Sequence, residues 1–254
     1  MPDFQLRTIQ TFQEIDQCIQ LQRATWGLPD VDITPARLFV VAQWSGAPSI
    51  GAFDTSDRVV GFVHTLMARH EGTPAFYSHM LAVDESLRDT GIGYSLKLAQ
   101  RDQALALNVP LVIWTFDPLQ SRNAHFNLNK LGAVVRRYAV NFYGEQHASV
   151  FDAGIGSDRV FAEWWVGSRR VELALAGEPS PPDVSHDSID IPGDFNSVKR
   201  TDHQQALIWR LQTREAFQSR LSRGLVVVGL ERDIGSGISR YRLASAEATS
   251  DALR

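Results

Sequence analysis

The chain has 254 residues, of which 44% are hydrophobic and 21% are charged, and its formal net charge is −4; this composition is typical of a soluble globular protein with one large domain or a domain and an appendage. The mildly acidic charge argues against nucleic acid as a partner, and no apolar run approaches the roughly 20 residues that cross a membrane. The first residues lack the pattern of a signal peptide, and a single cysteine, Cys18, excludes an internal disulfide framework, so we expect a cytoplasmic protein.

Apolar residues in the first 144 positions recur at alternating or helical spacing. They predict strands over residues 4–10, 49–55, 58–70, 74–83, 109–116 and 133–144, and helices over residues 11–26, 34–43 and 123–132. Thr34 is the expected N-cap of the second helix and Pro35 its first residue, and Gly132 is expected to end the third helix. This mixture of strands and helices predicts an α+β (mixed α/β) fold.

The pattern is looser after Gly144. Strands are expected over residues 158–167 and 169–177, followed by a linker rich in proline and serine over residues 178–188. A second unit then has a strand over 189–192, a long helix from about 198 to 223 and a strand over 224–233. We predict a catalytic core over 1–146, connecting strands and linker over 147–186, a C-terminal α/β extension over 187–243 and a flexible tail over 244–254.

The stretch RDTGIG, residues 88–93, follows the strand that ends at Val83 and leads directly into a helix. Gly91 and Gly93 would let backbone N–H groups approach an anion, which the positive end of the helix dipole also favours. A P-loop is absent, and a dinucleotide-binding fingerprint would need a third glycine where Leu96 stands. The stretch fits R-x-x-G-x-G and resembles the acyl-CoA signature of the GCN5-related N-acetyltransferase (GNAT) superfamily, as does the order of elements over residues 4–144.

This resemblance implies a GNAT-like central mixed sheet flanked by helices, with acetyl-CoA or another acyl-CoA as co-substrate. It implies that the loop and the helix start hold the CoA pyrophosphate, and that the end of the preceding strand supports the pantetheine arm. The residues placed in these roles are Leu81, Ala82, Val83, Arg88, Asp89, Thr90, Gly91, Ile92, Gly93 and Tyr94, with Asn123 and Phe126 as lining of the CoA arm. The backbone N–H near Leu81 is the implied oxyanion donor.

Strand alternation predicts that Tyr77, His79, Leu81 and Val83 share one face of their strand. Family members place a glutamate or histidines on this face, at the positions that Tyr77 and His79 occupy here. An imidazole with an ordinary pKa of about 6.5 can take up a proton near neutral pH, so His79 is the predicted general base. A packed, hydrogen-bonded histidine is the alternative interpretation.

The general acid of many family members, a tyrosine in the short helix, has no counterpart here because Leu128 stands at its position. Tyr143, Tyr94 and His125 are the candidate substitutes, in that order. A thiolate is a good leaving group near neutral pH, so acid catalysis is also dispensable.

The acceptor site is expected under loops such as the one that begins near Trp26. Asp117 ends an apolar strand, where its carboxylate could face an amine or stabilise a turn. His64 and His70 have no partners at metal-ligand spacing, so no metal is expected.

Arg210 and Arg214 lie one helical turn apart in the predicted long helix. Together they could hold a substrate carboxylate through bidentate hydrogen bonds. The alternative is a solvated pair of arginines that bind Glu215 or Asp202.

The sequence therefore predicts an acyl-CoA-dependent N-acyltransferase that transfers an acyl group to a primary amine of a small molecule by direct attack. One alternative is an amino-acid N-acyltransferase that uses succinyl-CoA or another larger acyl-CoA. The other is a non-catalytic acyl-CoA-binding regulatory module, which the missing helix tyrosine suggests. The sequence names neither the acceptor nor the oligomeric state, and a homodimer stays open.

Overall fold

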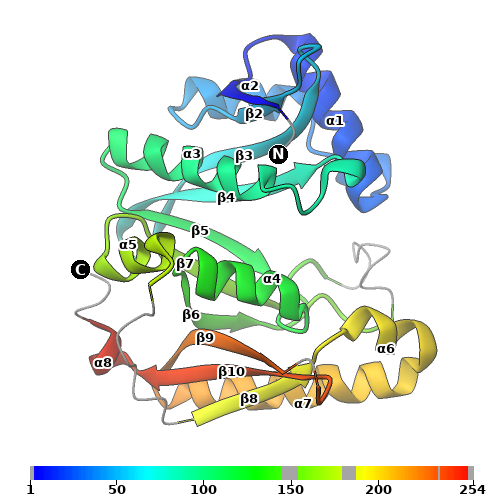
Figure 1. Ribbon diagram of the computed structural model, residues 1–254, viewed down its shortest axis with the longest axis vertical. Coiled ribbons are helices and arrows are strands. Elements are labelled where there is room, and N and C mark those ends of the chain that lie inside the picture. The colour runs from blue at the N-terminus through cyan, green and yellow to red at the C-terminus, as the bar shows by residue number, and fades with distance from the viewer. Residues whose placement is uncertain (1–2, 145–153, 179–186, 234, 251–254) are drawn as a thin grey trace. The chain divides into compact units, whose positions relative to one another are not determined.

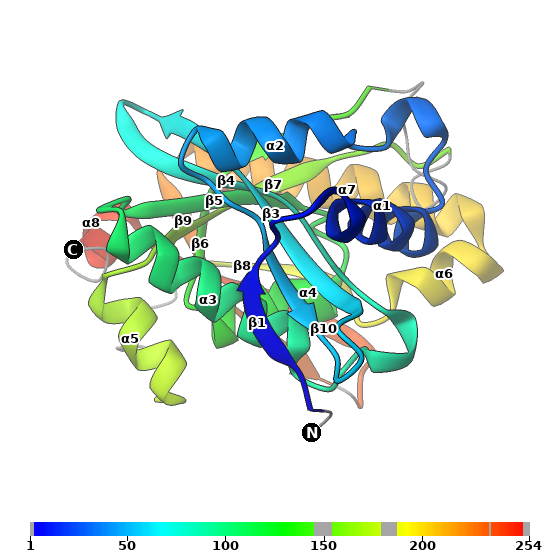
Figure 2. The same ribbon diagram turned by 90° about the horizontal axis from the view of Figure 1, so that it is seen from above.

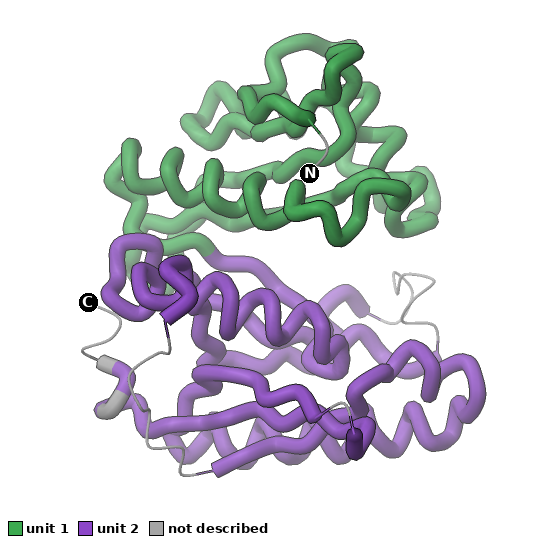
Figure 3. Tube along the Cα trace, in the orientation of Figure 1, with its two compact units in different colours: residues 1–112, 149–151 green, residues 113–148, 152–254 purple. Residues whose placement is uncertain are grey.

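The computed structural model of the chain describes residues 3–144, 154–178, 187–233 and 235–250. These residues divide into two units, of which unit 1 extends to Val112 and unit 2 begins at Ile113 (Figure 3). The predicted domain boundary at residue 146 and residues 179–186 of the predicted linker lie outside the described residues.

Unit 1 is built on four antiparallel strands in the order β1-β2-β3-β4 (Figure 1). The strands are β1 (Gln5–Thr8), β2 (Ile50–Phe53), β3 (Val59–His70) and β4 (Thr73–Val83). The helices are α1 (Phe12–Trp26), α2 (Ala36–Trp44) and α3 (Ile92–Ala106), with the short 3₁₀ turns η1 (Asp30–Asp32) and η2 (Glu85–Leu87). The strands and helices predicted for this region are confirmed.

The ends of α1 follow from local sequence, whereas the start of α2 does not follow the prediction. Thr11 and Glu14 form a capping box at the start of α1, and Gly27 ends the helix in the left-handed conformation. At α2 the N-cap is Pro35, without a side-chain hydrogen bond. The prediction of Thr34 as the N-cap is wrong, because its hydroxyl group is hydrogen-bonded to His79 instead.

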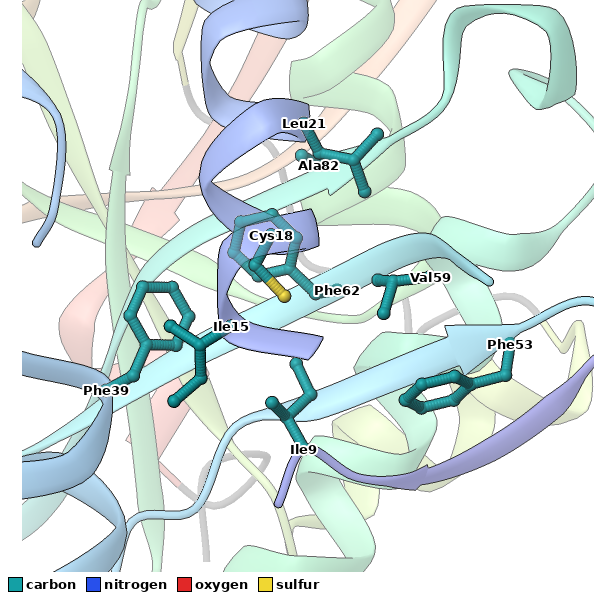
Figure 4. Close-up of a cluster of buried hydrophobic side chains, with 9 residues drawn as sticks. All are labelled: Ile9, Ile15, Cys18, Leu21, Phe39, Phe53, Val59, Phe62 and Ala82. Carbon is teal, nitrogen blue, oxygen red and sulfur yellow. The ribbon is translucent and has the colours of Figure 1, made fainter. Parts of the chain in front are cut away.

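Helices cover both faces of the strands in unit 1. On one face, α1 and α2 pack on β2, β3 and β4 through a buried cluster of Ile9, Ile15, Cys18, Leu21, Phe39, Phe53, Val59, Phe62 and Ala82 (Figure 4). The helix α3 lies on the other face (Figure 2). Its Ile92 and Leu96 side chains pack on residues of β2 and β3. Cys18 is fully buried in the first cluster, and burial raises the pKa of its thiol, so it stays an inert apolar side chain.

A β-bulge interrupts the pairing of β3 with β4 beside His79. Thr65 pairs with Ser78, and His64 pairs with Met80, so His79 is an extra residue in β4. An extra residue of this kind breaks the alternation of side chains between the two faces.

The bulge separates residues that strand alternation had placed together. Leu81 and Val83 pack in the cluster with α3, whereas Met80 packs in the cluster with α1 and α2. The His79 imidazole is hydrogen-bonded to Thr34, just before α2, so it lies on the α1 and α2 face. The prediction that His79 shares a face with Leu81 and Val83 is therefore wrong.

The strands of unit 2 follow the order β5-β7-β6-β9-β10-β8, with antiparallel pairing of β6 with β7 and β9, and of β10 with β9 and β8. Its strands are β5 (Leu111–Phe116), β6 (Val134–Ala139), β7 (Arg159–Trp165), β8 (Asp187–Pro192), β9 (Leu225–Asp233) and β10 (Ile238–Ser245). Its helices are α4 (Ser121–His125), the π-helical turn η3 (Phe126–Lys130), α5 (Arg169–Ala176), α6 (Phe195–Thr201), α7 (His203–Ser222) and α8 (Ala246–Ser250).

Four elements of unit 2 differ from the prediction. The single helix predicted from about 198 to 223 is instead divided at Asp202, which caps the start of α7, into α6 and α7. Residues 169–176 form the helix α5 rather than a strand, because Ser168 caps its start and Gly177 ends it in the left-handed conformation. The strand β10 was not predicted, although its buried Tyr241 and Leu243 alternate with less buried arginines. The tail predicted to be flexible includes the end of β10 and the helix α8, and residues 251–254 lie outside the described residues.

One buried ion pair and one partly buried ion pair attach α7 to the loops and strands of unit 2. Arg210 is 1% exposed and donates to both carboxylate oxygens of Asp117, at 2.8 and 3.0 Å. One turn later, Arg214 donates to both oxygens of Asp158 at 2.9 and 3.0 Å, and the hydroxyl of Tyr138 donates to the same carboxylate at 2.5 Å. Burial alone would raise the pKa of Asp117, but the charge and hydrogen bonds of Arg210 outweigh it and hold that pKa below its usual range.

We expect Arg210→Met to lower the free energy of unfolding by about 3–5 kcal/mol, because it leaves the buried Asp117 carboxylate without its partner. Chemical denaturation at pH 7 measures this loss. Arg223→Met is the matched control, since it removes an exposed arginine that pairs with Asp187, and such a pair contributes less than about 1 kcal/mol.

The same variant also changes the dependence of stability on pH. Because the folded-state pKa of Asp117 is depressed, the stability from its pairing is present above the unfolded pKa of about 3.9 and is lost as the pH falls through the folded value. Without Arg210 the pKa of the buried carboxyl rises, so the stability lost on substitution should shrink as the pH falls toward 5. Equal losses for the Arg210 and Arg223 variants would show that the buried pair has no special role.

Candidate functional site

The loop between β4 and α3 leaves the start of α3 uncapped by any side chain. Gly91 is the N-cap, with φ of 93° and no side-chain hydrogen bond. A Cβ atom built on Gly91 meets no protein atom within 4 Å, so the backbone there faces open space. A Cβ on Gly93 would lie 3.6 Å from Leu81 and 3.8 Å from Val83, which is ordinary contact. The first N–H groups of a helix have no intrahelical acceptor, so this arrangement suits an anion.

Hydrogen bonds within the loop hold its conformation. The Thr90 hydroxyl donates to the carbonyl of Leu87 at 2.7 Å, and Asp89 has a φ of 68°. Arg88 is exposed and pairs with Glu85 at 3.1 Å. The predicted cradle residues thus form one continuous loop and helix start, and Ala82 lies apart from them in the core beneath α1 and α2.

His79 lies on the α1 and α2 face of β4 with one ring nitrogen engaged. Its Nε2 atom is 3.0 Å from the Thr34 hydroxyl, and its side chain is partly open to solvent. Its ring centroid is 5.8 Å from that of His64 and 6.1 Å from that of Tyr77. Desolvation by the surrounding protein atoms lowers the pKa of His79, so the ring is neutral near pH 7 and can accept a proton.

His64 is a buried neighbour that sequence reasoning treated only as a possible metal ligand. It is fully buried, stacks on Phe39 at a centroid distance of 4.1 Å, and bonds Ser49 through Nδ1 at 2.7 Å. Desolvation, together with the nearby His79, lowers the pKa of His64 to about 3. Its Nε2 atom is buried without a hydrogen-bonding partner in the described structure. The buried, neutral His64 ring therefore packs edge-on beside the His79 ring.

Lys97 was also missed, and it lies on the opposite face of the bulge. Its ammonium nitrogen is buried and donates to Ser78 at 2.9 Å and to Gln100 at 3.0 Å. Gln100 in turn donates to Thr65 at 2.7 Å. Desolvation lowers the pKa of Lys97 well below its usual value. A lysine in a helix is normally a surface residue, so only the contact with the strands could reveal this one.

The remaining acceptor-site candidate in unit 1 is Trp26. It is half-buried at the end of α1 and packs against the apolar cluster beneath that helix. Its position before the α1–α2 connection agrees with the predicted loop, and a role in acceptor binding stays a prediction.

Of the three candidate acid residues, Tyr143 and His125 lie in unit 2, whereas Tyr94 lies in α3 of unit 1. Tyr143 is 44% exposed, and its hydroxyl lies 3.1 Å from the hydroxyl of Thr115 at the end of β5. Leu128 is buried at 1% exposure in the π-helical turn, where it serves packing. Asn123 is exposed on α4 and accepts a hydrogen bond from the buried Asn127, while Phe126 begins the turn that follows.

Arg210 and Arg214, which could have held a substrate carboxylate, instead bind carboxylates of the protein itself. Arg210 and Arg214 hold Asp117 and Asp158, neither of which was the predicted partner. Asp117 also accepts a hydrogen bond from the N–H of Leu119, which is the turn-stabilising alternative. Sequence spacing placed the arginines on one helical face correctly, but their acceptors come from distant parts of the chain.

Among the described residues, no group of three or more His, Cys, Asp or Glu side chains could hold a metal ion. No described helix is long and apolar enough to cross a membrane.

Comparison with known proteins shows similarity in fold. No family model matches the chain, and neither does any curated protein. An N-acetyltransferase from Staphylococcus aureus Mu50 matches with a TM-score of 0.52 and 14% identity, over 65% of this chain and 99% of that one. A putative acetyltransferase of the GNAT family from Desulfovibrio desulfuricans gives 0.52 and 13%, over 65% and 100%. Arabidopsis thaliana NAA60 in complex with acetyl-CoA gives 0.51 and 15%, over 64% and 99%. The 64–65% of this chain that these matches cover therefore has a GNAT-like fold, as predicted for the core.

We expect Gly91→Val to lower the affinity for CoA at least about tenfold, because its side chain would fill the open space beside the start of α3. Isothermal titration calorimetry with CoA measures the change. Gly46→Val is the matched control, since Gly46 has a φ of 95° and likewise has no atom within 4 Å of a built Cβ. Both substitutions impose the same backbone strain, so only the first should affect CoA binding.

Gly93→Ala separates ligand contact from strain, because Gly93 has no positive φ and its Cβ meets only ordinary contacts. It should keep the melting temperature of the wild type and still weaken CoA binding. If both glycine variants at the loop bind CoA as tightly as Gly46→Val does, the loop is not the pyrophosphate site.

Proposed function

We propose that the protein is an acyl-CoA-dependent N-acyltransferase that transfers an acetyl group to a primary amine of a small molecule. The observation that carries this proposal is the start of α3. An uncapped helix N-terminus there follows Gly91, whose backbone faces open space, within a fold shared with acetyltransferases. The glycines and the helix dipole would hold the CoA pyrophosphate.

The reaction is direct attack of the amine nitrogen on the thioester carbonyl. The new C–N bond forms, the negative charge passes to the carbonyl oxygen, and the C–S bond then breaks to release the CoA thiolate. The backbone N–H near Leu81 is the proposed donor to the oxyanion. His79 is the proposed base that takes the proton from the attacking nitrogen, directly or through water.

Acid catalysis is assigned no essential role. Leu128 packs in the core and has no proton to give, and a thiolate leaves readily near neutral pH. Tyr143 is the proposed proton donor, because its hydroxyl group is exposed and lies 3.1 Å from the Thr115 hydroxyl.

Acetyl-CoA is preferred over succinyl-CoA as the donor. The sequence offered Arg210 and Arg214 as the binding site for an acyl carboxylate, but both arginines are engaged by internal carboxylates. No other observation on the described residues favours a dicarboxylic acyl group.

The alternative function is that of a non-catalytic acyl-CoA-binding module. An assay of thiol release from acetyl-CoA, with a panel of primary amines, separates the two. Amine-dependent release with formation of the amide supports the enzyme, whereas tight acetyl-CoA binding without turnover supports the module.

We expect His79→Ala to lower kcat by about a hundredfold or more with little change in acetyl-CoA affinity, because it removes the proton acceptor but not the cradle. Once kcat/KM is expressed per concentration of unprotonated amine, the wild-type value should rise with pH through an apparent pKa below about 6.5, since desolvation lowers the pKa of His79. The variant should lose this ascending limb.

His70→Ala is the control, because His70 lies at the far end of the same strand pair, opposite Thr73. It should retain wild-type turnover. An active His79→Ala enzyme with an unchanged pH profile would return His79 to a packing role.

A further inference from the structure

A glutamine of α1 holds the backbone of Thr34 in a fixed position. The Gln22 side chain is fully buried. Its Oε1 atom accepts from the Thr34 N–H at 2.9 Å, and its Nε2 atom donates to the Thr34 carbonyl at 3.4 Å. The side-chain amide thus occupies both backbone groups of Thr34, as a neighbouring strand would.

Thr34 then presents its hydroxyl to His79. Thr34 is 5% exposed, and its Oγ1 atom lies 3.0 Å from His79 Nε2. Nδ1 of His79 has no hydrogen-bonding partner among the described residues, and the side chain is open to solvent on part of its surface. The two nitrogens therefore differ: Nε2 is held by the protein, and Nδ1 is left for other chemistry.

The direction of the hydrogen bond is fixed once His79 is protonated. Both nitrogens of an imidazolium carry hydrogens and can only donate, so the Thr34 oxygen must then accept from Nε2. A hydrogen bond to a charged group contributes more than one between neutral groups. Thr34 therefore stabilises the state that His79 reaches when it takes up a proton at Nδ1.

We propose that Gln22 and Thr34 position the His79 imidazole and set its tautomer, with Nε2–H donating to Thr34 and Nδ1 as the proton-accepting atom. This inference rests on the proposed role of His79 as the base. Thr34 and Gln22 are positioning residues, since both act through His79.

The titratable side chains in ring contact with His79 are His64 from β3 and Tyr77 from β4 itself. No charged side chain of the described structure shifts the pKa of His79, for which desolvation is the cause. Among the described residues, the Thr34 hydroxyl is thus the polar group that can favour the imidazolium form of His79. If this hydroxyl is removed, no charged side chain replaces its effect on the pKa of His79.

The test compares Thr34→Val, which keeps the shape and removes the hydroxyl, with Thr34→Ser, which keeps the hydroxyl. Nitrogen-15 NMR of the full-length chain, labelled in its histidines, reports the tautomer and the pKa of His79 without need of an acceptor. The wild type and Thr34→Ser should show the Nε2–H tautomer. Thr34→Val should lose that preference, and the pKa of His79 should fall further by about one unit, the equivalent of one charged hydrogen bond.

Kinetics with acetyl-CoA and the best amine of the panel give the second measurement. Thr34→Val should lower kcat roughly 10- to 100-fold with KM nearly unchanged, and Thr34→Ser should restore most of the activity. In the His79→Ala background, Thr34→Val should have no further effect, because the two residues act as one unit. Gln22→Leu should reproduce the loss of tautomer preference through displacement of Thr34.

The outcomes separate this inference from the function on which it rests. A fully active His79→Ala enzyme overturns the role of His79 as the base, and with it the positioning role of Thr34 and Gln22. If His79→Ala is impaired but Thr34→Val keeps the wild-type tautomer and kcat, the base survives and the positioning role is overturned. A Thr34→Val loss of equal size in the wild-type and His79→Ala backgrounds also overturns it, because Thr34 would then act on the fold or on acyl-CoA.

Discussion

The β-bulge at His79 is the constraint on which the candidate site depends. A regular strand would send His79 to the same face as Leu81 and Val83, against α3. The extra residue turns His79 to the α1 and α2 face while Leu81 and Val83 stay against α3. One strand thus supports the proposed CoA cradle through one face and carries the proposed base on the other. Bulges are found beside active sites because they re-aim a side chain in this way.

Polar side chains lie buried on both faces of the bulge. Lys97 and Gln100 bond Ser78 and Thr65 on the α3 face, and His64 bonds Ser49 on the other. Burial of such groups is unfavourable unless they are hydrogen-bonded, and even then it contributes less than an apolar core of the same volume. Both clusters are hydrogen-bonded within the described structure. Their common location at the bulge indicates that they maintain its geometry.

The sequence could predict what is encoded in consecutive residues. The RDTGIG loop, the strand before it and the helix after it were recognisable because glycine freedom and helix starts are local properties. The face of His79 was not predictable, since nothing in an alternating pattern reveals an extra residue. The partners of Arg210 and Arg214 were missed for a related reason: Asp117 and Asp158 are distant in the chain, and only the packing of α7 brings them to the helix. Gln22 and Lys97 look like ordinary helix-surface residues in the sequence, and their burial is a property of the tertiary structure alone.

The environment of His79 makes it a weak base, and the proposed reaction is compatible with that. An alkylammonium with a pKa of about 10.4 would not readily give a proton to an imidazole whose pKa lies below 6.5. After the amine nitrogen attacks the thioester, however, it carries a positive charge next to a tetrahedral carbon and becomes far more acidic. When the amine binds in its unprotonated form, a base need only act at that stage, and a neutral imidazole suffices. The desolvation that lowers the pKa of His79 also favours the neutral ring at neutral pH, and the neutral ring can accept a proton. Desolvation of the His79 ring therefore both makes it a weak base and keeps it in the neutral form that can accept a proton.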